Sequence, residues 1–269
     1  MDQTADILLL YKSAAVGTWF VLLFVLERVW PASPRSRLEG AGAGRIGDRR
    51  RLGRNIGFWL VNLALGPLVV ISISAWAVGW DSGLRPDWWG GWPGLIVDLI
   101  LLDFLIYWWH RANHEFPFLW RFHEIHHLDR FLDTTSAVRF HVGEVLLSAG
   151  FRAGVIMLFG IPVASVLAFE AAVLVAALFH HSNLRLLRGL ERGLARLVIT
   201  PSIHWIHHHA ERADTDSNYG TILSIWDPLF GSHNRRPRDL EMEIGVEGEA
   251  EPGFLAMLAR PFRARPPAA

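Results

Sequence analysis

The sequence predicts an all-α integral membrane protein, in which a bundle of about four to five membrane-spanning helices carries a histidine-rich helical cap on its cytoplasmic side. Hydrophobic residues make up 51% of the 269 residues and charged residues only 19%, which is too apolar for an ordinary soluble domain. Tryptophans cluster near the ends of apolar segments between residues 76 and 109, as in the aromatic belt at a membrane surface. The formal net charge of zero gives no indication of nucleic-acid binding.

The first apolar run, residues 7–30, is long enough to cross a bilayer. Asp2 and Asp6 precede it and no basic residue does, so we expect a retained helix rather than a cleaved signal peptide. The loop that follows is basic, because its arginines outnumber Glu39 and Asp48. The arginines are Arg35, Arg37, Arg45, Arg49, Arg50, Arg51 and Arg54. We interpret them as a signal of membrane topology only.

Three further apolar runs predict the remaining membrane segments. Residues 56–78 are of spanning length, and residues 95–109 lead directly into a pair of histidines. Residues 145–179 are too many for one span and are interrupted at Gly160-Ile161-Pro162. Because proline ends or kinks a helix, we expect two shorter helices that form a hairpin.

The positive-inside rule predicts the orientation. With the arginine-rich loop in the cytoplasm, the N-terminus lies outside. Successive crossings then return residues 110–141 and 180–209 to the cytoplasmic side. All histidine clusters are therefore expected on one face, the cytoplasmic face of a membrane that we expect to be a bacterial inner membrane.

Most of the thirteen histidines lie in three tight clusters. The clusters are His110 with His114, His123 with His126 and His127, and His204 with His207, His208 and His209. Residues three or four apart share one helix face, and imidazole nitrogens are common ligands of transition metals. The chain has no cysteine, which excludes thiolate-ligated haem, iron–sulfur clusters and thiolate zinc sites. The pattern predicts a polynuclear metal site at a membrane surface.

Other polar residues extend this prediction. Asp103 lies two helical turns before His110 and is expected to hold an imidazole N–H, although it could instead pair with Arg111 at the interface. His141 lies close enough to the second cluster to be a candidate ligand. His180 and His209 are expected to be neighbours of ligands, because one histidine of an adjacent pair points away, and His233 has no assigned role.

Two other functions fit parts of the pattern. The segment His123-Glu124-Ile125-His126-His127 matches the H-E-x-x-H signature, in which two histidines bind zinc and the glutamate is the general base of a hydrolase. This alternative leaves most of the histidines without a role. A membrane metal carrier is the other alternative, but it would need a polar path across the membrane.

The histidine spacing and its local sequence resemble those of the fatty acid hydroxylase/sterol desaturase superfamily. The resemblance covers residues 95–232. It rests on His-x3-His in 107–115, His-x2-His-His after Phe118-Leu119-Trp120-Arg121-Phe122, and a later His-x2-His-His. Further landmarks are Arg139-Phe140-His141 with Glu144, His181-Ser182-Asn183, Asp216-Ser217-Asn218-Tyr219-Gly220, and Trp226-Asp227-Pro228-Leu229-Phe230-Gly231.

The resemblance implies a non-haem di-iron centre that uses O2 to hydroxylate, or else to desaturate, an aliphatic C–H bond of a lipid-like or sterol-like substrate. The implied ligands are His110, His114, His123, His126, His127, His141, His181, His204, His207 and His208. Asp103, Asn183 and Asn218 are expected to support them. Zinc is expected to replace iron in some purified preparations, and electrons are expected from a separate electron-transfer protein.

The expected organisation has three parts. Residues 1–94 form membrane helices and the basic cytoplasmic loop, residues 95–234 form the hydroxylase-like catalytic domain, and residues 235–269 form a tail. The tail is rich in charge, proline and alanine, so we expect it to be partly disordered.

Overall fold

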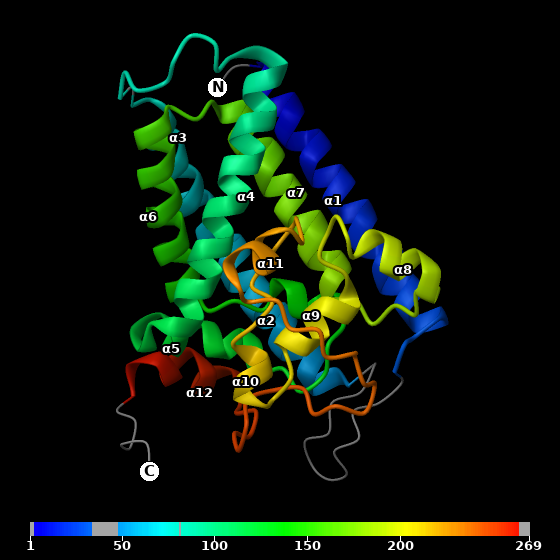
Figure 1. The fold of residues 1–269 in the computed structure, drawn as a ribbon. Helices are drawn as coiled ribbons and strands as arrows, with labels where there is room; N and C mark the ends of the chain where they lie inside the picture. The colour runs from blue at the N-terminus through cyan, green and yellow to red at the C-terminus, as the bar shows by residue number, and fades with distance from the viewer. Residues whose placement is uncertain (1–2, 34–47, 81, 264–269) are drawn as a thin grey trace.

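A bundle of long helices and a cap of shorter ones make up the fold (Figure 1), which a computed structural model describes for residues 3–33, 48–80 and 82–263. Five helical segments are long and apolar enough to cross a membrane, and the described residues contain no β-strand. The spans are Leu10–Val29 in α1 (Gln3–Val29), Arg49–Val78, α4 (Gly91–Glu115), α6 (Val142–Phe159) and α7 (Val163–His181). Both the helical class and the number of segments predicted from the sequence are confirmed.

The second span is made of three consecutive helical pieces. They are α2 (Arg49–Leu65), the π-helical turn η1 (Gly66–Ile71) and α3 (Ser72–Val78). Pro67 at the start of η1 has no N–H to donate to the helix ladder, which explains the change of helix type there. Asp48 caps α2 by accepting from the backbone N–H groups of Arg50 and Arg51.

A sharp corner follows α4. Phe116 has an extended backbone conformation and Pro117 begins α5 (Pro117–His127), because proline disfavours a helical conformation in the residue before it and is well accommodated at a helix start. The corner turns α5 across the end of the bundle (Figure 1). It thereby brings the histidines of α4 and α5 face to face.

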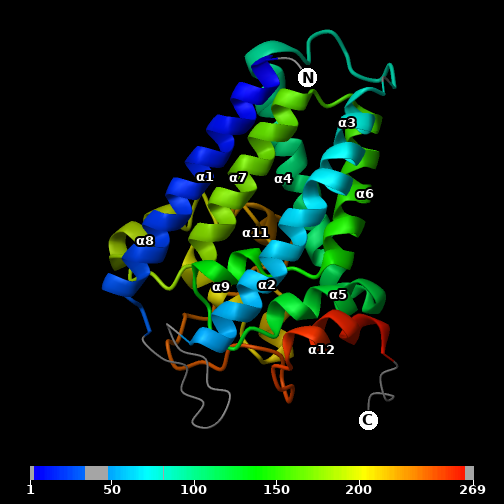
Figure 2. The ribbon, with the colours of Figure 1, turned by 180° about the vertical axis from the view of Figure 1, so that it is seen from behind.

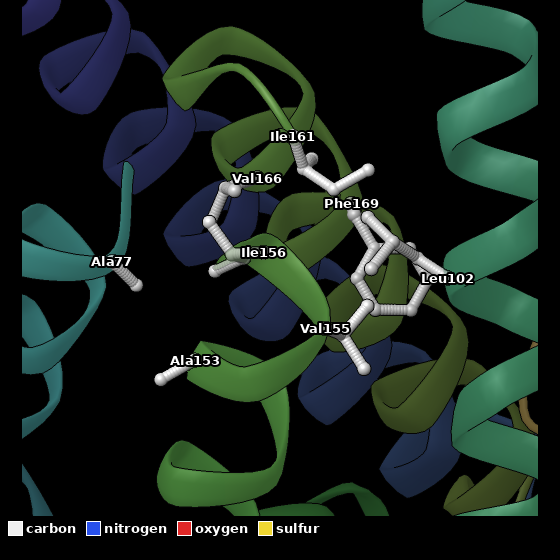
Figure 3. Packing of buried hydrophobic residues seen from close by; sticks show 8 residues of the cluster. All are labelled: Ala77, Leu102, Ala153, Val155, Ile156, Ile161, Val166 and Phe169. Carbon is white, nitrogen blue, oxygen red and sulfur yellow. The ribbon is translucent and has the colours of Figure 1, made fainter. Parts of the chain in front are cut away.

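The helices α6 and α7 form the hairpin predicted from the sequence. Gly160 ends α6 with φ of +58°, a left-handed conformation that glycine adopts without strain. Pro162 then precedes the first residue of α7. Side chains from α3, α4, α6 and α7 form the apolar core beside this hairpin, with Ile156, Val166 and Phe169 at its centre (Figure 3).

The cap lies at one end of the bundle, and the start of α1 lies near the other end (Figures 1 and 2). Its remaining pieces are η2 (Thr134–Val138), α8 (Arg188–Leu194), α9 (Pro201–His207), α10 (Arg212–Thr215), α11 (Trp226–Phe230), α12 (Phe254–Ala259) and η3 (Arg260–Phe262). The five spans alternate in direction, so the start of α2, the end of α4, the start of α6 and the end of α7 all reach the cap (Figure 2).

Two arginines of the predicted topology signal have structural partners in the cap. Arg51 is buried and pairs with Asp129 at 2.8 Å and with Asp133, and Arg54 pairs with Glu251. The interpretation as a topology signal only is therefore corrected for these two residues. Arg35, Arg37, Arg45 and Glu39 lie outside the described residues.

The described part of the expected tail, residues 235–263, contributes to the cap. Met257 of α12 is fully buried in a cluster with Phe58 of α2 and Ile125 and Leu128 of the α5 region. Arg260 donates to Glu124 at 2.7 Å. This segment is therefore a packed part of the cap rather than an appendage.

Candidate metal centre

Four helices place nine histidines in two adjacent groups. The first group consists of His110, His114, His123, His127 and His207, and the second of His126, His181, His204 and His208. Within each group the ligand nitrogens lie within 4.8 Å of one another. The structure thus brings together nine of the ten histidines implied as ligands.

Helical spacing explains how α5 and α9 serve both groups. His123 and His127 lie one turn apart and face the first group, whereas His126 faces the second. The helix α9 likewise contributes to both groups: His207 belongs to the first group and His204 to the second. The rings of His127 and His208 stack with their centroids 4.3 Å apart, so the two groups are in direct contact.

The nitrogens of the second group are closely packed around His181. Its Nε2 lies 3.0 Å from the Nε2 of His126 and 3.0 Å from the Nε2 of His204. The Nε2 atoms of His204 and His208 are 3.1 Å apart. Four imidazole nitrogens at such separations converge on one small volume, as ligands of a single ion do.

Six of the nine imidazoles have a partner at Nδ1 that fixes the orientation of the ring. Carbonyl oxygens accept from His110 (Tyr219, 2.8 Å), His126 (Arg139, 3.2 Å), His181 (Ala177, 2.7 Å) and His207 (Ser217, 2.7 Å). Carboxylates face His114 (Asp216, 3.3 Å) and His123 (Glu144, 2.7 Å). A hydrogen bond at Nδ1 fixes the tautomer with Nε2 free, which is the usual arrangement of metal-bound histidine.

The free nitrogens fit a metal. The Nε2 atoms of His114, His123 and His207 and both ring nitrogens of His127 are buried without a hydrogen-bond partner. Buried polar atoms without partners are costly, and a cation bound between them would satisfy them. A purely imidazole donor set suits iron or zinc.

Four histidines of α5 and α9, together with His208 just after α9, are also in the protonation state that metal binding needs. Burial, reinforced by the neighbouring imidazoles, holds the pKa values of these residues well below the usual value for histidine: His126, His127, His204, His207 and His208. They are neutral at physiological pH, and only a neutral imidazole can bind a metal.

His141 lies outside both groups, unlike the prediction. Its Nδ1 accepts from the backbone N–H of Gly143 at 2.9 Å, which caps α6. Its Nε2 lies 3.1 Å from the carbonyl oxygen of Leu258. Both ring nitrogens are therefore occupied, and His141 joins the start of α6 to α12.

Asp103 does not contact an imidazole either. Its carboxylate accepts from the backbone N–H groups of Ile222 and Leu223 and from the indole of Trp226 at 2.8 Å. Nor does it pair with Arg111, which bonds Glu115 at 2.7 Å. Asp103 instead holds the 219–226 loop against α4, and this loop supplies the carbonyl that fixes His110.

The two asparagines expected to support the ligands act on the backbone. Asn183 bonds both backbone groups of Ser33, which ties the end of α7 to the segment after α1. Asn218 has a positive φ of 53°, and its side-chain oxygen accepts from the backbone N–H of Asn234 at 2.9 Å. Asn218 thereby shapes the loop whose neighbouring carbonyls fix His207 and His110.

Three remaining histidines are placed as follows. The ring of His180 lies 4.0 Å from that of His204, and its Nδ1 is buried without a partner. His209 bonds Asp214 at 2.7 Å, and His233 is exposed. Sequence reasoning missed the supporting role of Glu144 and Asp216, although both stand within the recognised landmarks. No sequence signal identifies the supporting carbonyls, because every residue carries one.

A cavity of about 210 Å³ opens beside the histidines. It extends between α4, α6 and α7, and its walls include apolar side chains such as Ile106, Val173 and Leu174. The imidazoles of His110, His123, His126, His181 and His204 also line it. Both histidine groups therefore face a largely apolar space inside the bundle.

The geometry does not favour the zinc hydrolase alternative. Glu124, the expected general base, is 1% exposed and accepts from Arg260 of η3 at 2.7 Å. The carboxylate expected to act as a base is therefore held in an ion pair with an arginine of the cap. The buried, closed setting of both groups likewise does not resemble the transmembrane polar path of a carrier.

The fold and the site define a helical membrane protein with two buried groups of histidines that could hold metal ions. The fatty acid hydroxylase family model matches residues 95–232, and the chain belongs to this family.

Several curated proteins are similar to the chain. An ornithine lipid hydroxylase of Rhizobium tropici is 33% identical over 196 residues, which cover 73% of this chain and 58% of that protein. Alkylglycerol monooxygenases of Danio rerio and Homo sapiens are 29% and 30% identical, over 60% and 57% of this chain and 35% and 31% of their own lengths. The chain therefore spans just over half of the first relative and about a third of the other two. No solved structure matches the chain.

Proposed function

We propose that the protein is a membrane-bound non-haem di-iron oxygenase that hydroxylates, or else desaturates, an aliphatic C–H bond of a lipid. The observation that carries the proposal is the pair of buried imidazole groups beside an apolar cavity. The names of the relatives support lipid as the substrate class. In hydroxylation, the C–H carbon takes one oxygen atom of O2, and two electrons and two protons convert the other oxygen atom to water.

Two iron ions, one in each histidine group, would supply the activation of O2. The nine grouped histidines would hold them through their free nitrogens, with carbonyls, Glu144 and Asp216 keeping the rings in place. The cavity walls would hold the substrate chain beside the imidazoles and exclude water, which positions one carbon for reaction. Electrons would come from a separate donor protein.

The cap would lie in the cytoplasm of a bacterial cell, with the N-terminus outside. The cap and the start of α2, including Arg49 and Arg50, are at the same end of the bundle (Figure 2). The positive-inside rule favours the cytoplasm for that end.

The test is the iron content and O2-dependent lipid oxidation of the purified, iron-reconstituted protein. About two irons per chain and oxygenated lipid products are expected. His207→Ala in the first group and His126→Ala in the second should each lower the iron content and reduce turnover by at least about 100-fold, since each removes a ligand. Membrane insertion should remain intact in both variants.

His233→Ala is the matched control, because His233 is exposed and belongs to neither group. It should keep wild-type iron content and turnover. Full activity of His207→Ala and His126→Ala would contradict the proposal, and one zinc with no role for O2 would revive the hydrolase alternative.

A further inference from the structure

A polar stripe runs along the cavity-facing side of α6. Glu144, Ser148 and Arg152 are spaced four residues apart, and all three line the cavity. Side chains at this spacing lie above one another on one helix face. An acyl chain alone needs no polar wall, so the stripe indicates that the substrate brings polar atoms into the cavity.

Arg152 is the member of the stripe that lies deepest in the bundle. From Glu144 beside His123 to Arg152 the axis of α6 rises about 12 Å, at 1.5 Å per residue. Arg152 lies at the middle of the spanning helix α6. Charged groups at such depth are costly and normally serve a function.

The charges around Arg152 are unbalanced among the described residues. Glu170 of α7 pairs with Arg152 at 3.5 Å and also with Lys12 of α1, so two cations share one carboxylate. The Nε atom of Arg152 is buried without a hydrogen-bond partner. One further negative charge at this position would neutralise the cluster and satisfy the free N–H.

The other end of the stripe, beside the histidines, carries the carboxylate of Glu144 instead of a guanidinium. Glu144 uses one carboxylate oxygen to fix His123, and its Oε2 is buried without a partner. This oxygen is a free hydrogen-bond acceptor at the histidine end of the cavity, so it favours a donor-bearing segment of the substrate there. Charge complementarity therefore places an anionic group at Arg152 and a hydrocarbon or donor-bearing segment at the histidines.

We infer that the cavity selects lipids that carry an oxyanion, either a carboxylate or a phosphate, and seats this group against Arg152. The inference deepens the proposed oxygenase function, and for the position of reaction it rests on that function. With the anion held at Arg152, the reacting carbon lies well down the chain rather than beside the anionic group.

The experiment measures binding of three probes with the same chain length to metal-free protein in nanodiscs. The probes are palmitate, hexadecyl phosphate and hexadecanol. Palmitate or hexadecyl phosphate should bind at least about tenfold more tightly than hexadecanol, as a desolvated charge pair requires. The anion that binds more tightly identifies the natural group as carboxylate or phosphate.

Two variants separate anion binding from a structural ion pair. Arg152→Met should abolish the preference for the anions, and Arg152→Lys should restore part of it. Glu170→Gln breaks the same ion pair but leaves both cations, so it should retain or strengthen the preference. A purely structural pair would make Arg152→Met and Glu170→Gln behave alike.

Equal binding of palmitate, hexadecyl phosphate and hexadecanol to the wild-type protein would overturn the inference, whether or not the variants fold. Iron-loaded protein is assayed in parallel for O2 consumption with each probe. Selective anion binding without oxidation of any lipid would refute the proposed function and leave the binding site standing. Oxidation of a lipid without any preference for anions would refute the anion-binding site and leave the proposed function standing.

Discussion

Arg51 connects the membrane bundle to the loop that follows the second histidine cluster. Its guanidinium donates to Asp129, Asp133 and the carbonyl of Phe131, and both carboxylates are fully buried. Removing one member of a buried ion pair leaves an uncompensated charge in a region that water cannot reach. The loop after His127 is therefore held by α2, where Asn55 also donates to Asp129 and Thr135.

Arg51→Ala is expected to destabilise the protein by about 3–5 kcal/mol, because Asp129 and Asp133 would lose their main partner. Arg50→Ala is the matched control, since Arg50 is the exposed neighbour on the same helix, and its cost should stay within about 0.5 kcal/mol. Thermal and denaturant unfolding in detergent measure both. Equal stability of the two variants would show that the pair contributes nothing.

At the residue scale, the spacing of the histidines predicted which of them would lie together. Residues three and four apart on a helix must share a face, so nine predicted ligands converge. The prediction differed from the structure at His141 and Asp103. Apart from the indole of Trp226 on Asp103, their partners are backbone groups of Gly143, Leu258, Ile222 and Leu223. Backbone partners are set by the tertiary path of the chain, which residue types do not reveal.

At the scale of elements, α12 shows how a short helix can secure the cap. Met257 on its inner face is fully buried, whereas Leu255 is 77% exposed. The inner face packs on Phe58 of α2 and Ile125 of α5. Glu251, just before the helix, bonds both Arg54 and Arg139, so α2, α5 and the loop before α6 all meet this segment.

Met257→Ala should lower stability by about 2–5 kcal/mol, because it opens a cavity in a packed cluster. Leu255→Ala, two residues away on the exposed face, should change stability by no more than about 0.5 kcal/mol. Unfolding in detergent and iron content after reconstitution would be compared for the two variants. A tolerant response to Met257→Ala would mean that α12 is not needed for the cap.

The long elements followed from the sequence because apolar length is a strong signal. The α6–α7 hairpin and the continuation of α4 through His114 match the expected spans and break. The segment after residue 235 was not predictable in this way. Within residues 235–263, the helix α12 has only six residues, and its docking depends on contacts with α2 and α5 rather than on its own composition.

At the scale of the whole molecule, the alternating spans make the two ends of the bundle different in the residues that they carry. Both histidine groups lie at the cap end, while the turn at Gly160 and the 82–90 connection lie at the far end (Figure 1). Because the cap gathers segments from every part of the chain, the orientation of a single span fixes the compartment of the metal centre.

The absence of cysteine allows this orientation to be measured directly. Asp87→Cys at the far end and Glu247→Cys on the cap both replace exposed residues. A membrane-impermeant maleimide applied to intact cells should label Asp87→Cys alone, and detergent lysis should expose Glu247→Cys. Labelling of Glu247→Cys in intact cells would place the cap outside and reverse the predicted topology.

The contacts of Glu251 and Met257 also bear on the order in which parts of the cap can form during synthesis. A growing chain has already produced His208 before it reaches residue 251, and so the walls around the histidines are unfinished while synthesis continues. The contacts that hold α12 on α2 and α5 can therefore form only near the end of synthesis, after both histidine groups have been made.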